Sequence, residues 1–163
     1  MTTAAATTLP HPKAVRDMLE ELLGRDVEVA PCDPLVPGEK ELVSIAVYVD
    51  DSLRTCALVA CDLPLSAFAG ASIGLIPKGG AEACVEDREL SPMVRDNLYE
   101  VLNIVSALFN LPGHVHTKLY ALHAPGDIPP ADVSAALRSI GRRLDLSVEI
   151  GGYGSGKLAV VLV

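Results

Sequence analysis

The sequence is poor in aromatic residues and in positive charge. Only 4% of its 163 residues are aromatic and none is tryptophan, whereas 50% are hydrophobic, so we expect an aliphatic core. Thirteen Lys and Arg residues stand against 21 Asp and Glu residues, which gives a net charge of −8. Nucleic acids and anionic membrane surfaces attract basic protein faces. The charge balance therefore argues against both as partners.

Signals for export, membrane insertion and disulfide pairing are also lacking. No apolar run approaches the roughly 20 residues that cross a bilayer. The N-terminus has neither the basic start nor the apolar block of a secretory signal. Cys32, Cys56, Cys61 and Cys84 form no C-x-x-C pair and no disulfide-scaffold spacing. We therefore expect free thiols, most simply buried as small apolar side chains, in a protein of the reducing cytoplasm.

Two short motifs have structural interpretations that outweigh the functional ones. Residues 151–157, GGYGSGK, match the letters of a phosphate-binding loop, but Leu158 occupies the Ser/Thr position and a strand pattern follows where a helix is required. We expect a hairpin turn there. His114, His116 and His123 have no acidic or thiol ligand near them in the sequence, so no metal site is predicted.

The length fits one domain at residues 11–163 behind a loose tail at residues 1–10. Alternating apolar patterns predict strands at residues 26–32, 41–49, 54–61, 117–123, 144–150 and 158–163. Amphipathic or small-residue patterns predict helices at residues 12–23, 64–75, 91–110 and 129–142. Residues 77–89 are expected to be a charged loop. The last strand is apolar on both faces, so either it is central in the sheet or a second subunit covers it in a homodimer.

The predicted helix at residues 91–110 is the most informative segment. Ser91 and Pro92 suit its start, and no further glycine or proline interrupts it before residues 111–113. Most of its circumference is apolar, as expected of a core helix. One polar line remains, formed by Asp96, Glu100, Asn103 and Asn110. Their spacing of four, three and seven residues puts them on one face.

This helix resembles the signature helix of the CheC/CheX/FliY family of response-regulator phosphatases. The family pattern is written E-I-x-N-I-x-x-G, and residues 100–107 here read EVLNIVSA. The resemblance implies an α+β fold, a CheC-like α/β sandwich in which helices pack on a mostly antiparallel sheet. Two departures are visible. Ala107 replaces the glycine, and the first helix carries no second E-x-x-N, since Leu23 and Gly24 lie three residues after Glu20 and Glu21. A single site is similar to CheX.

The resemblance also implies a reaction, the hydrolysis of an aspartyl phosphate on a CheY-like receiver domain. The receiver would supply the Mg²⁺, so the chain needs no cofactor of its own. Asn103 would hold a water in line with the phosphorus, because an amide can both donate and accept hydrogen bonds. Glu100 would pair with the receiver lysine and dock the helix, and Asp96 would be a docking residue at the rim.

Two other interpretations remain open at this point. The same helix face could bind a receiver or another protein without catalysis, which the alanine at position 107 and the single site leave possible. The Glu100 and Asn103 pair could also be accidental, in a purely structural or ligand-binding domain. Burial of both side chains against the rest of the chain would favour this last interpretation.

Overall fold

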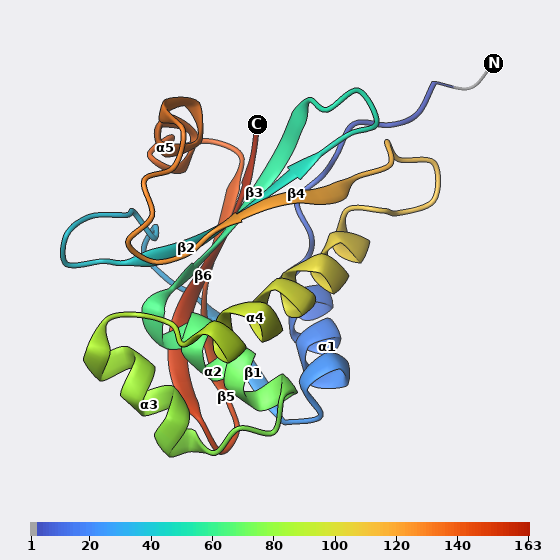
Figure 1. Ribbon diagram of the computed structural model, residues 1–163. Helices are drawn as coiled ribbons and strands as arrows, with labels where there is room; N and C mark the ends of the chain where they lie inside the picture. The colour runs from blue at the N-terminus through green and yellow to red at the C-terminus, as the bar shows by residue number, and fades with distance from the viewer. Residues whose placement is uncertain (1–2) are drawn as a thin grey trace.

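A computed structural model describes residues 3–163 and contains one six-stranded, fully antiparallel sheet (Figure 1). The strand order across the sheet is β1-β5-β6-β3-β2-β4, so β1 and β4 form its edges. The strands are β1 (Val27–Pro31), β2 (Val43–Val49), β3 (Thr55–Asp62), β4 (Lys118–His123), β5 (Arg143–Ile150) and β6 (Gly154–Leu162). The α+β class and the antiparallel sheet expected from the sequence are confirmed.

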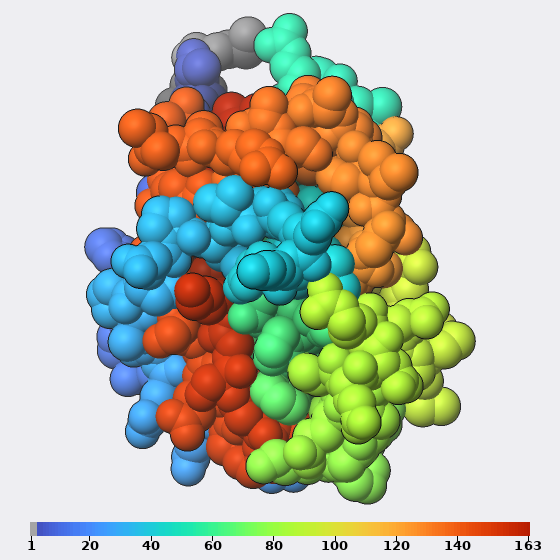
Figure 2. All heavy atoms as spheres, turned by 90° about the vertical axis from the view of Figure 1, so that its left-hand side faces the viewer, coloured from blue at the N-terminus to red at the C-terminus, as the bar shows by residue number. Residues whose placement is uncertain are grey.

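Helices cover both faces of this sheet. Their bounds are α1 (Pro12–Leu23), α2 (Leu63–Ile73), α3 (Lys78–Asp87), α4 (Pro92–Val105) and α5 (Ala131–Leu137). Figure 1 shows α1, α2 and α4 together on one face, with α3 beside α2 and α5 on the opposite face. The larger core lies under α1, α2 and α4, and a smaller core, containing Leu58, Val161 and Leu137, lies under α5. Figure 2 shows α5 and the segment after β1 side by side on the surface.

Local sequence signals explain most of these elements. The Asp62 side chain accepts a hydrogen bond from the Leu65 N–H, which caps α2, the helix predicted at residues 64–75. Gly24 ends α1 in the left-handed conformation. Strand β6 lies between β5 and β3, so its two apolar faces are buried within one chain. That pattern therefore requires no second subunit, and a homodimer stays a prediction.

Residues 77–89 were predicted to be a loop, and this is wrong, because Lys78–Asp87 form α3. The two glycines and the charges of this segment hid the helix. Its inner side is nevertheless apolar, with Ala81 and Cys84 buried three residues apart. A Cβ on Gly80 would come within 2.7 Å of Ile76 Cγ2, so glycine allows α3 to begin close to the end of α2. Tertiary burial outweighs the low helix propensity of glycine here.

The ends of two other predicted segments also differ from the structure. The helix expected at residues 129–142 is only α5, and Ile140, an apolar residue of the predicted range, is 95% exposed beyond the end of α5. Residues 1–2 of the predicted tail lie outside the described residues. Further along that tail, Ala5 bonds through its N–H to the Gly113 carbonyl and through its own carbonyl to the Val115 N–H.

A buried ion pair joins three parts of the chain on the α5 face. Arg143 and Asp145, two residues apart on β5, form a bidentate pair at 2.7 and 2.8 Å, with side chains 6% and 7% exposed. The remaining Arg143 donors reach the carbonyls of Leu137, Ser139 and Leu35. Asp145 in turn accepts from the Leu35 N–H at 2.8 Å. This network holds the end of α5 and the segment after β1 against the sheet.

Removal of the arginine should therefore destabilise the fold strongly. We expect Arg143→Met to lower the free energy of unfolding by about 3–5 kcal/mol, because it leaves Asp145 charged, buried and unpaired. Denaturant unfolding of the two proteins measures this difference. Lys13→Met is the control, since Lys13 pairs with Asp17 at the surface and its loss should leave the midpoint unchanged. Equal midpoints for Arg143→Met and wild type would contradict this role of the network.

Candidate functional site

Helix α4 buries one side and exposes the other. The Ser91 hydroxyl accepts from the Val94 N–H at its start, as predicted. The α-helix ends at Val105 and passes into a 3-10 turn, η1 (Ser106–Leu108), so the predicted rod at residues 91–110 is α-helical for 14 residues. Its buried side chains are Val94, Leu98, Val101, Leu102 and Val105. Ile104, counted among the apolar residues of a core helix, is 44% exposed.

Glu100 and Asn103 both lie on the exposed side of α4. Asp96 is exposed one turn before Glu100, and Ala107 is exposed one turn after Asn103. At about 100° per residue these four positions fall within one narrow stripe of the helix surface. Within residues 3–163, no hydrogen bond or ion pair engages the side chains of Glu100 or Asn103. The pair is thus open to solvent and uncommitted to the fold.

Apolar side chains border this stripe. Met93 is 64% exposed, Tyr99 41% and Ile104 44%. On the helix surface Tyr99 lies on one side of the stripe, and Met93 and Ile104 lie on the other. Two carboxylates and one amide framed by exposed apolar groups form a surface suited to a protein partner rather than to a small molecule.

The fourth residue of the predicted polar line has a different role. The Asn110 amide bonds the backbone of Thr117 twice, donating to its carbonyl at 2.8 Å and accepting from its N–H at 2.7 Å. This pair of bonds ties the segment after η1 to the start of β4. Asn110 is therefore engaged in the fold, and the stripe available to a partner ends near Ala107.

The position of α4 is set by close contact with α2. A Cβ on Gly70 would lie 2.5 Å from the Val94 carbonyl oxygen, so only glycine allows the two backbones to approach this far. Asn97, half buried on α4, donates from Nδ2 to the Gly70 carbonyl at 3.0 Å. Neither residue belongs to a motif of the sequence. A polar side chain on the flank of an otherwise apolar surface was the only available signal.

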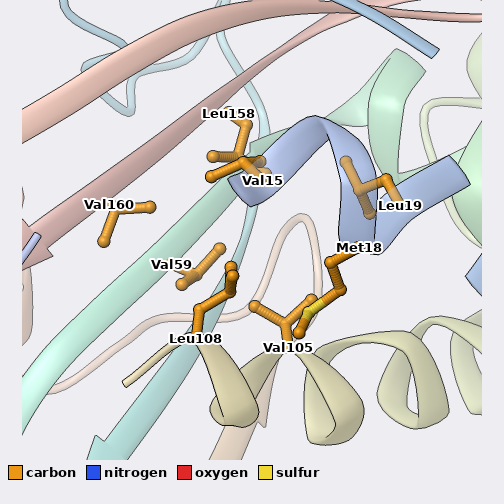
Figure 3. A pocket seen from close by; sticks show the side chains of 8 residues that line it. All are labelled: Val15, Met18, Leu19, Val59, Val105, Leu108, Leu158 and Val160. Carbon is orange, nitrogen blue, oxygen red and sulfur yellow. The ribbon is translucent and has the colours of Figure 1, made fainter. Parts of the chain in front are cut away.

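The inward side of α4 is a packed core and not a ligand site. Figure 3 shows one of the small apolar gaps near it, a cavity of about 10 Å³ between α1, the end of α4 and the sheet. Its lining residues are Val15, Met18, Leu19, Val59, Val105, Leu108, Leu158 and Val160. A gap of this size without polar partners is too small and too apolar to hold an ordered water. Any function of α4 must therefore use its outward side.

The end of α4 is held from below by Tyr48. This side chain of β2 is fully buried, and its hydroxyl donates to the Leu102 carbonyl at 2.5 Å. The ring packs against Phe109 with centroids 5.2 Å apart. Burial raises the pKa of the Tyr48 phenol well above its usual value, so it remains a donor. The sequence signal for this role is a tyrosine in an otherwise largely aliphatic strand.

The other candidate motifs take part in the fold. Residues 151–153 form the β5–β6 turn and β6 begins at Gly154, as the hairpin interpretation predicted. His116 contacts Asp51 at 3.1 Å on the surface. Among residues 3–163, no three His, Cys, Asp or Glu side chains gather as a metal site requires. In the same part of the chain, no helix combines the length and the hydropathy needed to cross a bilayer.

Comparisons with solved structures identify the fold. No protein-family model matches the sequence, and no curated protein matches it significantly. The FliM middle domain from H. pylori superposes with a TM-score of 0.55 at 11% identity, covering 92% of this chain and 83% of that one. Thermotoga maritima FliY gives 0.54 at 15% identity, covering 90% and 80%. A chain of the CheX–CheY–BeF3–Mg²⁺ complex from Borrelia burgdorferi gives 0.55 at 14% identity, covering 92% and 93%.

The fold is therefore CheC-like, as the resemblance implied. The three TM-scores are nearly equal, so the structure is no more similar to the CheX complex than to FliM or FliY. At these identities the comparison concerns the fold alone. What the stripe on α4 does must be argued from its own residues.

The contact between α2 and α4 generates a prediction about stability. Gly70→Ala should lower the free energy of unfolding by about 1–3 kcal/mol, because the new methyl group overlaps the Val94 carbonyl and forces the helices apart. Chemical unfolding measures this change. The matched control is Gly79→Ala in α3, where a Cβ meets no atom within 4 Å. That variant should gain up to about 1 kcal/mol from helix propensity. A stabilised Gly70→Ala would refute the close contact.

Proposed function

We propose that the protein hydrolyses the aspartyl phosphate of a CheY-like receiver domain, using Asn103 and Glu100. The observation that supports it best is the free, outward-facing pair on a helix whose other side is anchored in the core. In α4 and the turn after it, Asn97 and Asn110 bond backbone groups of neighbouring segments, whereas Asn103 is left to solvent. An exposed amide on a rigid helix suits the positioning of a water molecule.

In this reaction the chain needs only to position the attacking water. A water oxygen forms a bond to phosphorus while the bond from phosphorus to the receiver carboxylate oxygen breaks. Inorganic phosphate and a free aspartate result, and the proton of the water passes to the phosphate. The Asn103 amide has no useful pKa and cannot act as a base, but it can hold that water in line. Positioning is most of what phosphoryl transfer requires of a protein, and the receiver brings the Mg²⁺ that neutralises developing charge.

Glu100 has a docking role in this proposal. A carboxylate would be repelled by the phosphoryl group itself, so it must meet a cation on the partner, and the receiver lysine is the natural one. Asp96 extends the negative charge along the stripe, and the apolar groups of Tyr99 and Ile104 bury surface around the pair. The helix would thus insert as a wedge with its charged stripe facing the phosphorylated site.

Asn103→Ala should lower the maximal rate of receiver dephosphorylation by about 100-fold, because the amide that positions the attacking water is lost. The decay of a phosphorylated receiver, followed with and without catalytic amounts of each protein, measures it. Asn103 is exposed, so the unfolding midpoint should not change. Decay at the same rate with the variant and the wild type would remove the assignment of Asn103.

Glu100→Gln should act on docking instead. The receiver concentration that gives half-maximal rate should rise about tenfold, and this increase should shrink as salt is added, because a charge pair across the interface is lost. The same decay assay, run as a titration, gives both parameters. Glu82→Gln, an equal change of charge on exposed α3, should leave the half-maximal concentration unchanged. A fall in maximal rate alone would assign Glu100 a chemical role.

A second function has support from two observations. The fold is as similar to the FliM middle domain as to the CheX complex. The exposed Ala107 also places a methyl group where the family pattern has glycine. Both fit a module that docks on a receiver or another protein through α4 without turnover. Tight binding of a BeF3-treated receiver together with unaccelerated phosphoryl decay would select this function.

A further inference from the structure

We infer that Tyr48 is a positioning residue for Asn103, acting through the peptide group between Leu102 and Asn103. The inference rests on the proposed function of Asn103 but is read from a different part of the structure. Tyr48 lies on β2, beneath α4, and its side chain is fully buried. It acts through the backbone of the helix and not on a substrate.

The Tyr48 side chain contacts the backbone of α4 directly before Asn103. The Tyr48 hydroxyl donates to the Leu102 carbonyl. That carbonyl and the Asn103 N–H are the two ends of one planar peptide group. A bond that fixes the carbonyl therefore fixes the plane from which the Asn103 Cα and its side chain extend. Glu100 lies before this peptide and does not share it.

A second hydroxyl holds the other side of Asn103. Ser106 donates to the Asn103 carbonyl from its side chain at 2.6 Å, and its backbone N–H donates to the same oxygen. Both peptide groups that flank the Asn103 Cα are thus held by hydroxyl groups. They lie where α4 passes into η1, a place where an unsupported helix end frays.

Strand β2 is irregular on both sides of Tyr48. The register of β2 shifts between Val47 and Tyr48 against β4, and between Tyr48 and Val49 against β3. Irregularities of this kind bend a strand and re-aim a side chain. Phenylalanine would fill the same volume without a hydroxyl to satisfy. The buried phenol and the shifted register together indicate a bond placed to serve the helix end.

The test compares two tyrosines with the same kind of bond. Tyr48→Phe removes the hydroxyl under Asn103. Tyr153→Phe removes a buried hydroxyl that donates to the Ile76 carbonyl at 2.6 Å, away from α4. Each variant is assayed with a phosphorylated receiver for maximal rate and half-maximal concentration. Amide spectra of the 15N-labelled proteins report on the Asn103 N–H without any need for activity.

We expect Tyr48→Phe to lower the maximal rate about tenfold, since a loosened Asn103 holds its water less well. The half-maximal concentration should stay within about twofold, because the Glu100 backbone is untouched. The Asn103 amide resonance should move. Tyr153→Phe should match wild type in all three measurements. Equal maximal rates for the two tyrosine variants would overturn the inference, whatever their stabilities.

Failure of the proposed function is distinguishable from failure of this inference. If wild type accelerates no receiver, the phosphatase proposal falls, and the Asn103 amide resonance alone tests the inference. A resonance that moves in Tyr48→Phe but not in Tyr153→Phe supports the positioning of Asn103 by Tyr48. A resonance that does not move in Tyr48→Phe overturns it. Should Tyr48→Phe fail to fold, Ser106→Ala removes the hydroxyl on the other side of Asn103 from a partly exposed position. A fall in its maximal rate with an unchanged half-maximal concentration supports the premise that the flanking peptide groups position Asn103, and an unchanged maximal rate overturns that premise and the role of Tyr48 with it.

Discussion

The contact between α2 and α4 is the constraint on which the rest of the structure depends. Helix α2 is buried almost all round and consists largely of small residues, so it forms a thin layer between the sheet and α4. With glycine at position 70, the α4 backbone comes close enough to place its apolar side chains in the main core. Once that side is fixed, the 3.6-residue period leaves the opposite arc of α4 to solvent.

Rigidity of the exposed stripe follows from three anchors outside it. The Asn97 amide fixes the first half of α4 to α2, the Tyr48 hydroxyl holds the end of the helix from β2, and Asn110 fixes the following segment to the start of β4. Each anchor bonds a backbone group, so the helix is held without using the side chains of the stripe. The helix that carries Glu100 and Asn103 is consequently held in position before any partner binds.

The sequence predicted the parts of this arrangement that follow from local chemistry. The cap at Ser91 is a local signal and was confirmed, and α1 ends at Leu23 as predicted, with Gly24 directly after it. Helix α3 was missed because the burial of Ala81 depends on α2, which local sequence does not reveal. The exposure of Ile104 was missed for the same reason. Helical spacing placed Glu100 and Asn103 on one polar line, but their roles came only from the family resemblance, since two polar residues three apart are common on helices.

Ala107 shows where the remaining choice between hydrolysis and docking lies. Its methyl group sits on the exposed side of η1, and its backbone has none of the left-handed geometry that would demand glycine. The backbone at position 107 therefore does not require glycine, and under the proposed function we expect the glycine of the family pattern to matter for how closely a partner approaches the helix. A methyl group here leaves Asn103 and its supports untouched and changes only how near a receiver can come. Hydrolysis requires that the Asn103 amide and the phosphorus share one water, whereas docking tolerates a wider gap. How closely a partner fits around Ala107 thus separates hydrolysis from docking, and the same fold is compatible with both.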